Sequence, residues 1–381
     1  GRAIEKLPRF KLRFFLECAE EVLGILRDHT DWDITDIRSD WDTSKALFHC
    51  DEARKAPAAI LRILGELCDL SEAQYVRVTT VDNGFFANWL QLLDAHYFAD
   101  AMAVVDPDWI ITGKEREFNY GSPGEDVFNG LFQQICTRDP LCSSRFDVTH
   151  RFNFLLINVF RGRFLRGPQA ARRRLEYSKV AQRIFMPHPR ILKRLDEILE
   201  RPRDASRNCF LIGVHKRVDN PGTARMQLEQ RMLQTGSYIS AVKKVALRYA
   251  EKSKNDSNDS CEVKIVLASD DEDAVAEFQK VFGDRLICNK AAKRSKGGIN
   301  DKKLPLEVHG QEEKLTLSDA EDCLVDALLL AACDAFVHAD SNLTIAAGIL
   351  NPHSAAYHVR DLADTLEAGD WPGYRRCGLP F

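Results

Sequence analysis

Long hydrophobic runs and an excess of charge of one sign are both missing from this chain of 381 residues. Apolar stretches such as 325–337 are short and contain Asp334, so none of them is predicted to span a bilayer. The formal net charge of −4 gives no sign of a nucleic-acid-binding protein. With 45% hydrophobic and 29% charged residues, the composition is that of a soluble globular protein, long enough for two domains.

No signal peptide is recognisable at Gly1, although a targeting or anchor segment upstream of it could have been removed. Asn255 and Asn258 match the N-glycosylation acceptor pattern. Both lie in the polar run 253–260, which is predicted to be a surface loop with or without a glycan. The compartment stays open, with the secretory lumen slightly favoured over the cytoplasm.

The eleven cysteines lack the regular spacing of a disulfide scaffold or a zinc site. Cys136 and Cys142, six residues apart, are candidates for one bridge. Three others lie in apolar segments and are predicted to be buried thiols: Cys209, Cys323 and Cys333.

The order of the predicted elements indicates an α/β protein. Helical spacing in 9–28 and 56–70 predicts an N-terminal helical extension over 1–72. A strand at 75–81, a helix at 86–101 and a short strand at 103–106 open a first Rossmann-like domain, assigned to 73–205. Strands at 210–214, 263–268, 285–288 and 335–337, separated by helical stretches, form a second one over 206–350. The polar segment 201–207 is the predicted linker, and 351–381 the C-terminal tail.

The most informative segment is 210–220, Phe-Leu-Ile-Gly-Val-His-Lys-Arg-Val-Asp-Asn. A buried strand is predicted to end directly before His215, Lys216 and Arg217. Potential cations at a strand's carboxyl end are typical of anion sites in α/β proteins, and Arg offers a planar fork of donors for a phosphate. A strand end with solvated charges is the alternative.

Two further patterns follow in the second half. Asp326 is an acid in an otherwise apolar helix, so it needs a partner, which a guanine base or a nearby Arg could supply. The segment 338–342, His-Ala-Asp-Ser-Asn, lies between a strand and a helix. Its Ser341 and Asn342 could cap that helix or help it bind phosphate.

The order of these patterns resembles the GDP-fucose-using glycosyltransferases, a group with α1,6-fucosyltransferases, the nodulation fucosyltransferase and protein O-fucosyltransferases. The resemblance covers roughly 75–350. It implies that Arg217 grips the β-phosphate of GDP with His215 beside it, and that Asp326 reads guanine. It also implies that the loop with Asp340, Ser341 and Asn342 lies beside the phosphates.

The N-terminal half carries a looser match, because Gly84 and Asn88 resemble the Gly-x-x-x-Asn loop and helix found early in these enzymes. Both are therefore donor-binding candidates, although Gly84 could simply form a tight turn. At the position where the family carries its acidic candidate base, this sequence has Ala224 instead. Asp219 or Glu229 could substitute as the base, and the acceptor and the sugar stay open.

The acids at 270–273 follow a strand and precede a helix. Asp271 and Asp273 form an Asp-x-Asp pattern that could hold a metal, but acids are expected at a helix N-terminus from capping and the helix dipole. No metal and no cofactor are predicted. The lysine-rich stretch 289–313 is predicted to be a mobile loop, either a lid whose Lys293, Arg294 and Lys296 close over the diphosphate or a surface insertion.

Together with these observations, the resemblance implies a metal-independent, inverting glycosyltransferase of the GT-B type, with two facing Rossmann-like domains. It would transfer fucose from GDP-fucose to a hydroxyl of a glycan or glycoprotein, without nucleic-acid or membrane partners. Arg217 would neutralise charge on the leaving diphosphate. The alternatives are another nucleotide sugar as donor, or an inactive nucleotide- or glycan-binding protein.

Overall fold

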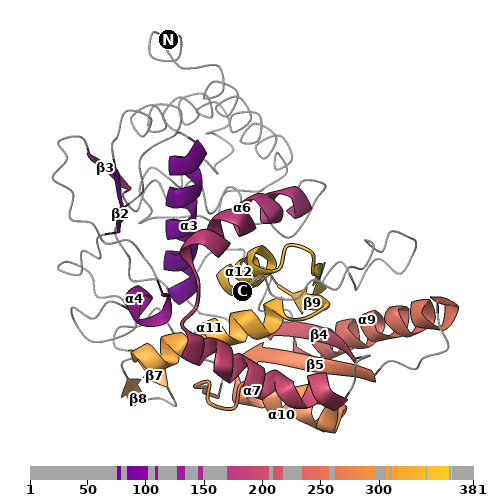
Figure 1. Cartoon of the computed structure of the whole chain (residues 1–381). Coiled ribbons are helices and arrows are strands. Elements are labelled where there is room, and N and C mark those ends of the chain that lie inside the picture. Colours follow the sequence, from indigo (N-terminus) through magenta and orange to yellow (C-terminus); the bar gives the residue numbers. More distant parts are fainter. Residues whose placement is uncertain are drawn as a thin grey trace, which may run out of the picture. The chain divides into compact units, whose positions relative to one another are not determined.

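Figure 1 shows the computed structural model of the chain. The chain forms two compact units. Unit 1 comprises 1–81, 88–115 and 136–160, and unit 2 comprises 82–87, 116–135 and 161–381. The structure describes 75–78, 84–101, 108–109, 127–133, 145–148, 170–205, 209–217, 234–256, 262–296, 306–308, 311–313, 315–339, 341–359 and 362. The predicted extension over 1–72 lies outside these residues.

Unit 1 contains a small parallel sheet with the strand order β2-β1-β3. Its elements are β1 (Tyr75–Val78), β2 (Asp108–Trp109), β3 (Arg145–Val148) and most of α3 (Phe85–Ala101). The predicted strand and helix at the start of this half are confirmed. The next strand is described at Asp108–Trp109, and the segment 103–106, where it was predicted, lies outside the described residues.

Unit 2 is built on a five-stranded, all-parallel sheet with the order β10-β9-β4-β5-β6. Its strands are β4 (Cys209–Lys216), β5 (Glu262–Ser269), β6 (Leu286–Ile287), β9 (Ala335–His338) and β10 (Ala355–His358). β4 comes first in the chain among the strands of this sheet and lies at its centre. The strand order therefore reverses between β4 and β9, as in doubly wound sheets. The α/β class is confirmed. The facing two-domain arrangement stays a prediction.

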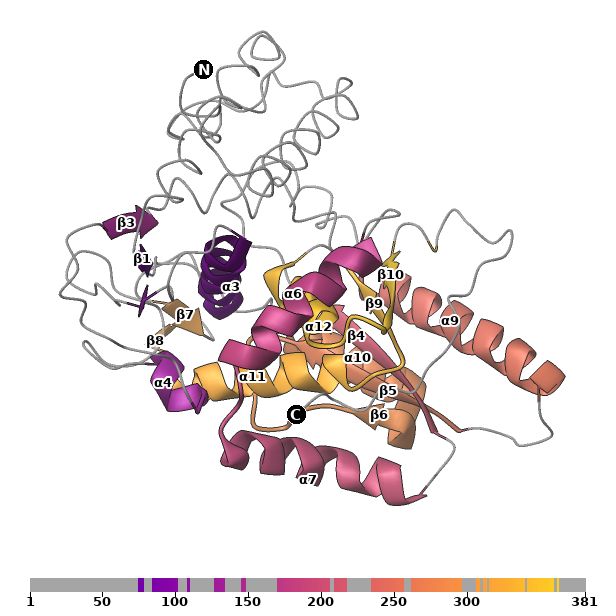
Figure 2. The same ribbon diagram turned by 45° about the horizontal axis from the view of Figure 1, so that its top comes forward.

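The helices of unit 2 surround this sheet. They are α4 (Val127–Leu131), α6 (Ala170–Ile184), α7 (Pro189–Ala205), α9 (Thr235–Asp256), α10 (Glu272–Phe282), the 3₁₀ turn η5 (Gly283–Arg285), α11 (Leu317–Ala331) and α12 (Asn342–Leu350). Helix α7 contacts α11, and α6 contacts α12 (Figure 1 and Figure 2). A short antiparallel pair, β7 (Leu306–Val308) and β8 (Gln311–Glu313), precedes α11.

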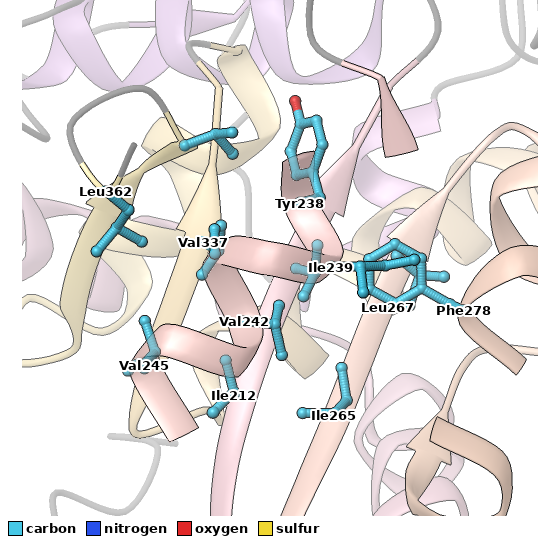
Figure 3. Packing of buried hydrophobic residues seen from close by; sticks show 14 of the residues in the cluster. Ile212, Tyr238, Ile239, Val242, Val245, Ile265, Leu267, Phe278, Val337 and Leu362 are labelled. Carbon is cyan, nitrogen blue, oxygen red and sulfur yellow. The ribbon is translucent and has the colours of Figure 1, made fainter. Parts of the chain in front are cut away.

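Alternation along the strands distributes the core between two faces. Ile212 of β4 and Ile265 of β5 belong to one buried cluster with Val242 of α9 and Phe278 of α10 (Figure 3). The next residue along β4, Gly213, approaches the side chain of Leu330 on α11. Helices therefore cover both faces of the sheet, which is how an all-parallel sheet is usually buried.

Two predicted domain boundaries differ from the boundaries of the compact units. Helices α6 and α7, assigned to the domain over 73–205, belong to unit 2. There Arg174 donates to the carbonyl of Pro352, and Arg190 and Arg194 both donate to Glu321. The strand β10 lies in the predicted tail 351–381 but pairs with β9. Contacts between distant segments set these boundaries, and a composition change does not reveal them.

Two helices are longer than predicted. Helix α7 continues to Ala205, through most of the segment predicted as a linker. Helix α9 continues to Asp256, so Asn255 is helical and not part of a loop. Polar composition alone does not end a helix, because the outer face of a surface helix is normally polar.

The described cysteines, Cys209, Cys288, Cys323 and Cys333, form no disulfide bond. Cys333 is buried, as predicted, whereas Cys209 and Cys323 are only partly buried. The candidate bridge between Cys136 and Cys142 lies outside the described residues. Within the described parts of the chain, every helix is too short or too polar to cross a membrane.

Gly213 lets α11 pack closely on β4. A Cβ atom there would lie 3.0 Å from Leu330 Cδ2 and 3.1 Å from both Cys333 Sγ and Phe336 Cβ. We expect Gly213→Ala to lower the free energy of unfolding by about 1–3 kcal/mol in urea denaturation, as overpacked cores do. Gly236→Ala in α9 is the matched control, since nothing lies within 4 Å of its added methyl group. An unchanged midpoint for Gly213→Ala would contradict this account.

Candidate functional site

The carboxyl ends of β4 and β9 mark the place where the strand order reverses. Ligands of open α/β sheets bind outside the carboxyl ends of the strands at such a reversal. His215 and His338 are register partners on these two strands. The chain after β4 begins with Arg217, and the chain after β9 leads to Ser341 at the start of α12. The sequence-predicted segments therefore meet at this edge.

His215 and Ser341, 126 positions apart, are in direct contact. The Ser341 hydroxyl lies 3.0 Å from Nδ1 of His215. The same hydroxyl accepts from the backbone N–H of Thr344 at 3.1 Å, and Oγ1 of Thr344 accepts from the N–H of Ser341 at 3.2 Å. Ser341 is thus the N-cap of α12 in a reciprocal capping box and also a partner of His215. The helix-capping role predicted for Ser341 is confirmed, and its role in phosphate binding stays a prediction.

His215 is not a cation at neutral pH. Burial, with smaller contributions from the nearby charges of Arg217, His338 and Lys216, lowers its pKa from 6.5 to about 3. The ring can therefore serve as a neutral hydrogen-bonding group only. The sequence interpretation of three potential cations at the end of β4 is corrected to two.

Those two cations differ in their surroundings. Lys216 is buried, and its Nζ donates to the backbone carbonyl of Arg217 at 3.2 Å. Arg217 is exposed at the end of the strand. Of this pair, Arg217 is the cation that solvent, and hence a ligand, can reach.

Asp326 lies one helical turn before Leu330, on the face of α11 that packs against the sheet. It is 8% exposed, and its Oδ1 has no hydrogen-bond partner among the described residues. Burial raises its pKa from 3.8 to about 7, although the charge of Arg294 opposes that rise. A buried carboxyl with an unsatisfied oxygen is a candidate ligand contact, because leaving that oxygen unpaired is costly.

A chain of polar contacts surrounds Asp326. Asn289, 1% exposed after β6, donates from Nδ2 to Oδ1 of Asp322 at 3.2 Å. Asp322 also pairs with Arg194 of α7, whose other nitrogen donates to Glu321 at 2.8 Å. This network places charges of both signs near Asp326, and the carboxylate of Asp322 helps to raise its pKa.

The segment after β6 is more ordered than its composition predicts. Ser295 forms a parallel bridge with Asp271, and its N–H donates to the carbonyl of Asp270 at 3.1 Å. The guanidinium of Arg294 donates to the carbonyls of Ala292 and Asn289. Residues 289–296, and the strands β7 and β8, therefore do not form the structureless loop predicted over 289–313. In this structure Arg294 is held by backbone carbonyls and does not reach out as a lid.

The acids after β5 act locally. Oδ1 of Asp271 accepts from the N–H of Asp273 at 3.1 Å and caps α10. Ser269 in turn accepts from the N–H of Asp271 at 3.2 Å. Within the described part of the chain, no group of His, Cys, Asp or Glu side chains is arranged to hold a metal ion. Helix capping accounts for this Asp-x-Asp pattern.

Several predicted site residues are not brought to this edge by the described contacts. Asp219, Glu229 and Asp340 lie outside the described residues. Gly84 precedes α3, where its carbonyl accepts from Ala87 at 2.9 Å, and Asn88 is buried within α3. Gly84 and Asn88 stay predictions. Asn342 is half-buried at the start of α12, with Oδ1 unpaired among the described residues.

Sequence reasoning missed three residues of the site. Thr344 had a local signal, because a hydroxyl residue three positions after Ser341 suits a capping box. Asn289 and Asp322 had none. Their role depends on a contact between the end of β6 and α11, 33 positions apart.

No family model and no curated protein matches the chain. Among solved structures, it is similar to a NodZ α-1,6-fucosyltransferase soaked with GDP-fucose, with 15% identity over 73% of this chain and 93% of that chain, and a TM-score of 0.40. Fucosyltransferase NodZ from Bradyrhizobium is 14% identical over 74% of this chain and 93% of that chain, with a TM-score of 0.39. A mutant of Arabidopsis thaliana FUT1 in complex with GDP is 11% identical over 87% of this chain and 77% of that chain, with a TM-score of 0.37. At these TM-scores the likeness carries no argument on function.

The raised pKa of Asp326 makes stability depend on pH. The folded protein keeps a proton that the unfolded chain loses near pH 4, so this group's contribution to stability is lost as pH rises towards its folded pKa of about 7. Asp326→Asn should therefore gain stability relative to the parent by a few kcal/mol between about pH 4 and about pH 8, at about 1.4 kcal/mol per pKa unit.

Urea unfolding at several pH values measures this difference. Asp284→Asn, at an exposed position, is the control and should show a flat difference. If the stability difference between Asp326→Asn and the parent is also independent of pH, the pKa of Asp326 is not raised in the folded protein.

Proposed function

We propose that this chain is a glycosyltransferase that takes its sugar from a GDP-linked donor, GDP-fucose in the first instance. The observation that carries the proposal is the meeting of His215 and Ser341 at the point of strand reversal. Both belong to the ordered motifs that resemble the GDP-fucose-using enzymes. A donor diphosphate at this edge would face the exposed Arg217 and the N-terminus of α12.

Asp326 is the proposed reader of the base. Guanine presents adjacent N–H and NH₂ donors, which suit the two acceptor oxygens of an ionised carboxylate. The oxygen Oδ1 lacks a hydrogen-bond partner among the described residues, and a bound guanine would supply one. Because the pKa is about 7, guanine binding should favour the ionised form and release a proton.

The proposed reaction is displacement at the sugar C1 by an acceptor hydroxyl, with inversion. Arg217 would neutralise the charge that grows on the leaving diphosphate. Asp219 or Glu229 is the proposed base. The acceptor would be a glycan or glycoprotein in the secretory pathway, and we propose that no metal ion is needed because Arg217 supplies positive charge.

A panel of nucleotides tests the donor class. We expect GDP to raise the melting temperature more than UDP, ADP or CMP do. Affinity for GDP, measured by calorimetry, should increase from about pH 6 to about pH 8 as Asp326 ionises. Asp326→Asn should lose at least about tenfold in GDP affinity, the cost of one bond to a charged group, and should flatten the pH dependence.

Affinity for ADP is the internal control, because adenine lacks the adjacent N–H and NH₂ donors that would pair with this carboxylate. Equal losses for GDP and ADP would mean that Asp326 supports the helix and does not read the base. No shift with any nucleotide would overturn the proposed function. A GDP shift without sugar transfer or donor hydrolysis would leave a nucleotide-binding protein.

Arg217→Ala should weaken GDP binding and sugar transfer with little loss of stability, since the side chain is exposed. Loss of one preorganised charged contact is worth about 2–4 kcal/mol in the transition state, roughly a hundredfold in kcat or more. Assays run in EDTA test metal independence at the same time. Restoration of activity by Mn²⁺ alone, or an unfolded variant with normal GDP affinity per folded molecule, would contradict these roles.

A further inference from the structure

His215 and α12 are joined through two hydroxyl groups. Ser341 Oγ lies 3.0 Å from Nδ1 of His215 and 3.1 Å from Oγ1 of Thr344. Thr344 is fully buried, and its hydroxyl donates to the carbonyl of Ser341 at 2.9 Å or of Ala339 at 3.3 Å. The chain Thr344–Ser341–His215 is buried throughout.

Only a few placements of the hydroxyl and imidazole protons fit these contacts. The Thr344 hydroxyl proton is used on a backbone carbonyl, and its oxygen accepts from the N–H of Ser341. The Ser341 oxygen accepts from the N–H of Thr344, so its own proton is free for Nδ1 of His215. The neutral ring carries a single N–H, on one nitrogen or the other.

The helix decides between the two tautomers. Nδ1 faces the N-cap of α12, where the helix dipole is positive and favours an acceptor over a donor. An unprotonated Nδ1 that accepts from Ser341 satisfies this preference. The proton is then on Nε2, the ring nitrogen not used in the contact with Ser341.

We propose that Ser341, held by Thr344, is a positioning residue that locks His215 in its Nε2–H tautomer, so that a neutral histidine donates a hydrogen bond to an anionic ligand at the strand end. The tautomer itself follows from the fold. The identity of the ligand, a donor phosphate oxygen, rests on the proposed function. A neutral donor adds a directed bond beside Arg217 without a second charge to desolvate.

Nitrogen NMR of the full chain, labelled with ¹⁵N-histidine and free of nucleotide, tests the tautomer. The His215 signals are assigned by their loss in His215→Gln. We expect Nδ1 to be unprotonated and Nε2 to be protonated near neutral pH. Thr344→Val removes the oxygen that accepts from the Ser341 N–H and contacts its hydroxyl, so the Ser341 hydroxyl should no longer be fixed toward Nδ1 and the ring should become a mixture of tautomers. Thr344→Ser, which restores the hydroxyl, should return the single form.

A matched control separates positioning from helix capping. Thr316→Val breaks the capping box of α11, whose partner is Asp319 and not a histidine. It should cost similar stability and leave the His215 tautomer unchanged. For GDP, Thr344→Val should lose on the order of tenfold in affinity, the worth of one bond to a charged group, and Thr344→Ser should recover it.

A proton on Nδ1 in the parent protein, or an unmixed tautomer in Thr344→Val, would overturn the proposal. If the tautomer behaves as expected and no nucleotide binds, the positioning role stands and the proposed function fails. If GDP binds and Thr344→Val binds it normally, the role of the tautomer in ligand binding fails while the proposed function stands.

Discussion

The reversal of strand order between β4 and β9 is the constraint on which the rest of unit 2 depends. It sends helices to opposite faces of the sheet and leaves the carboxyl ends of two adjacent central strands without a crossover above them. His215 and Ser341 meet at this opening. Gly213 lets α11, the helix that carries Asp326, pack closely on β4 of this sheet.

Burial determines the protonation of the site. The ring of His215 is kept neutral and the carboxyl of Asp326 keeps its proton up to about pH 7, both mainly through desolvation. In the resting protein, the exposed Arg217 therefore supplies the accessible positive charge at the end of β4. The Oδ1 of Asp326 has no hydrogen-bond partner among the described residues, so a group that presents a hydrogen-bond donor would satisfy it.

The ion pairs between α7 and α11 place charges near Asp326 that act on its pKa. Arg194 neutralises Asp322 from a neighbouring helix, and Asn289 shares that carboxylate. Asp322 is buried, so removing Arg194 would leave this carboxylate without its cation, which is usually more costly than the pair is worth. The network therefore ties α7, which sequence composition assigns to another domain, to the helix α11 that carries Asp326.

The sequence by itself determined the α/β class, most of the strands and helices of unit 2, and the position of His215 and Arg217 at a strand end, because hydrophobic periodicity and turn residues are local signals. Capping of α10 by Asp271 was also within its reach. Only the tertiary structure decided that β10 completes the sheet, that α7 belongs to unit 2, that His215 is neutral, and that Asn289 lies against Asp322. Those features depend on burial and on neighbours far away in the chain, and neither is encoded in any short stretch of residues.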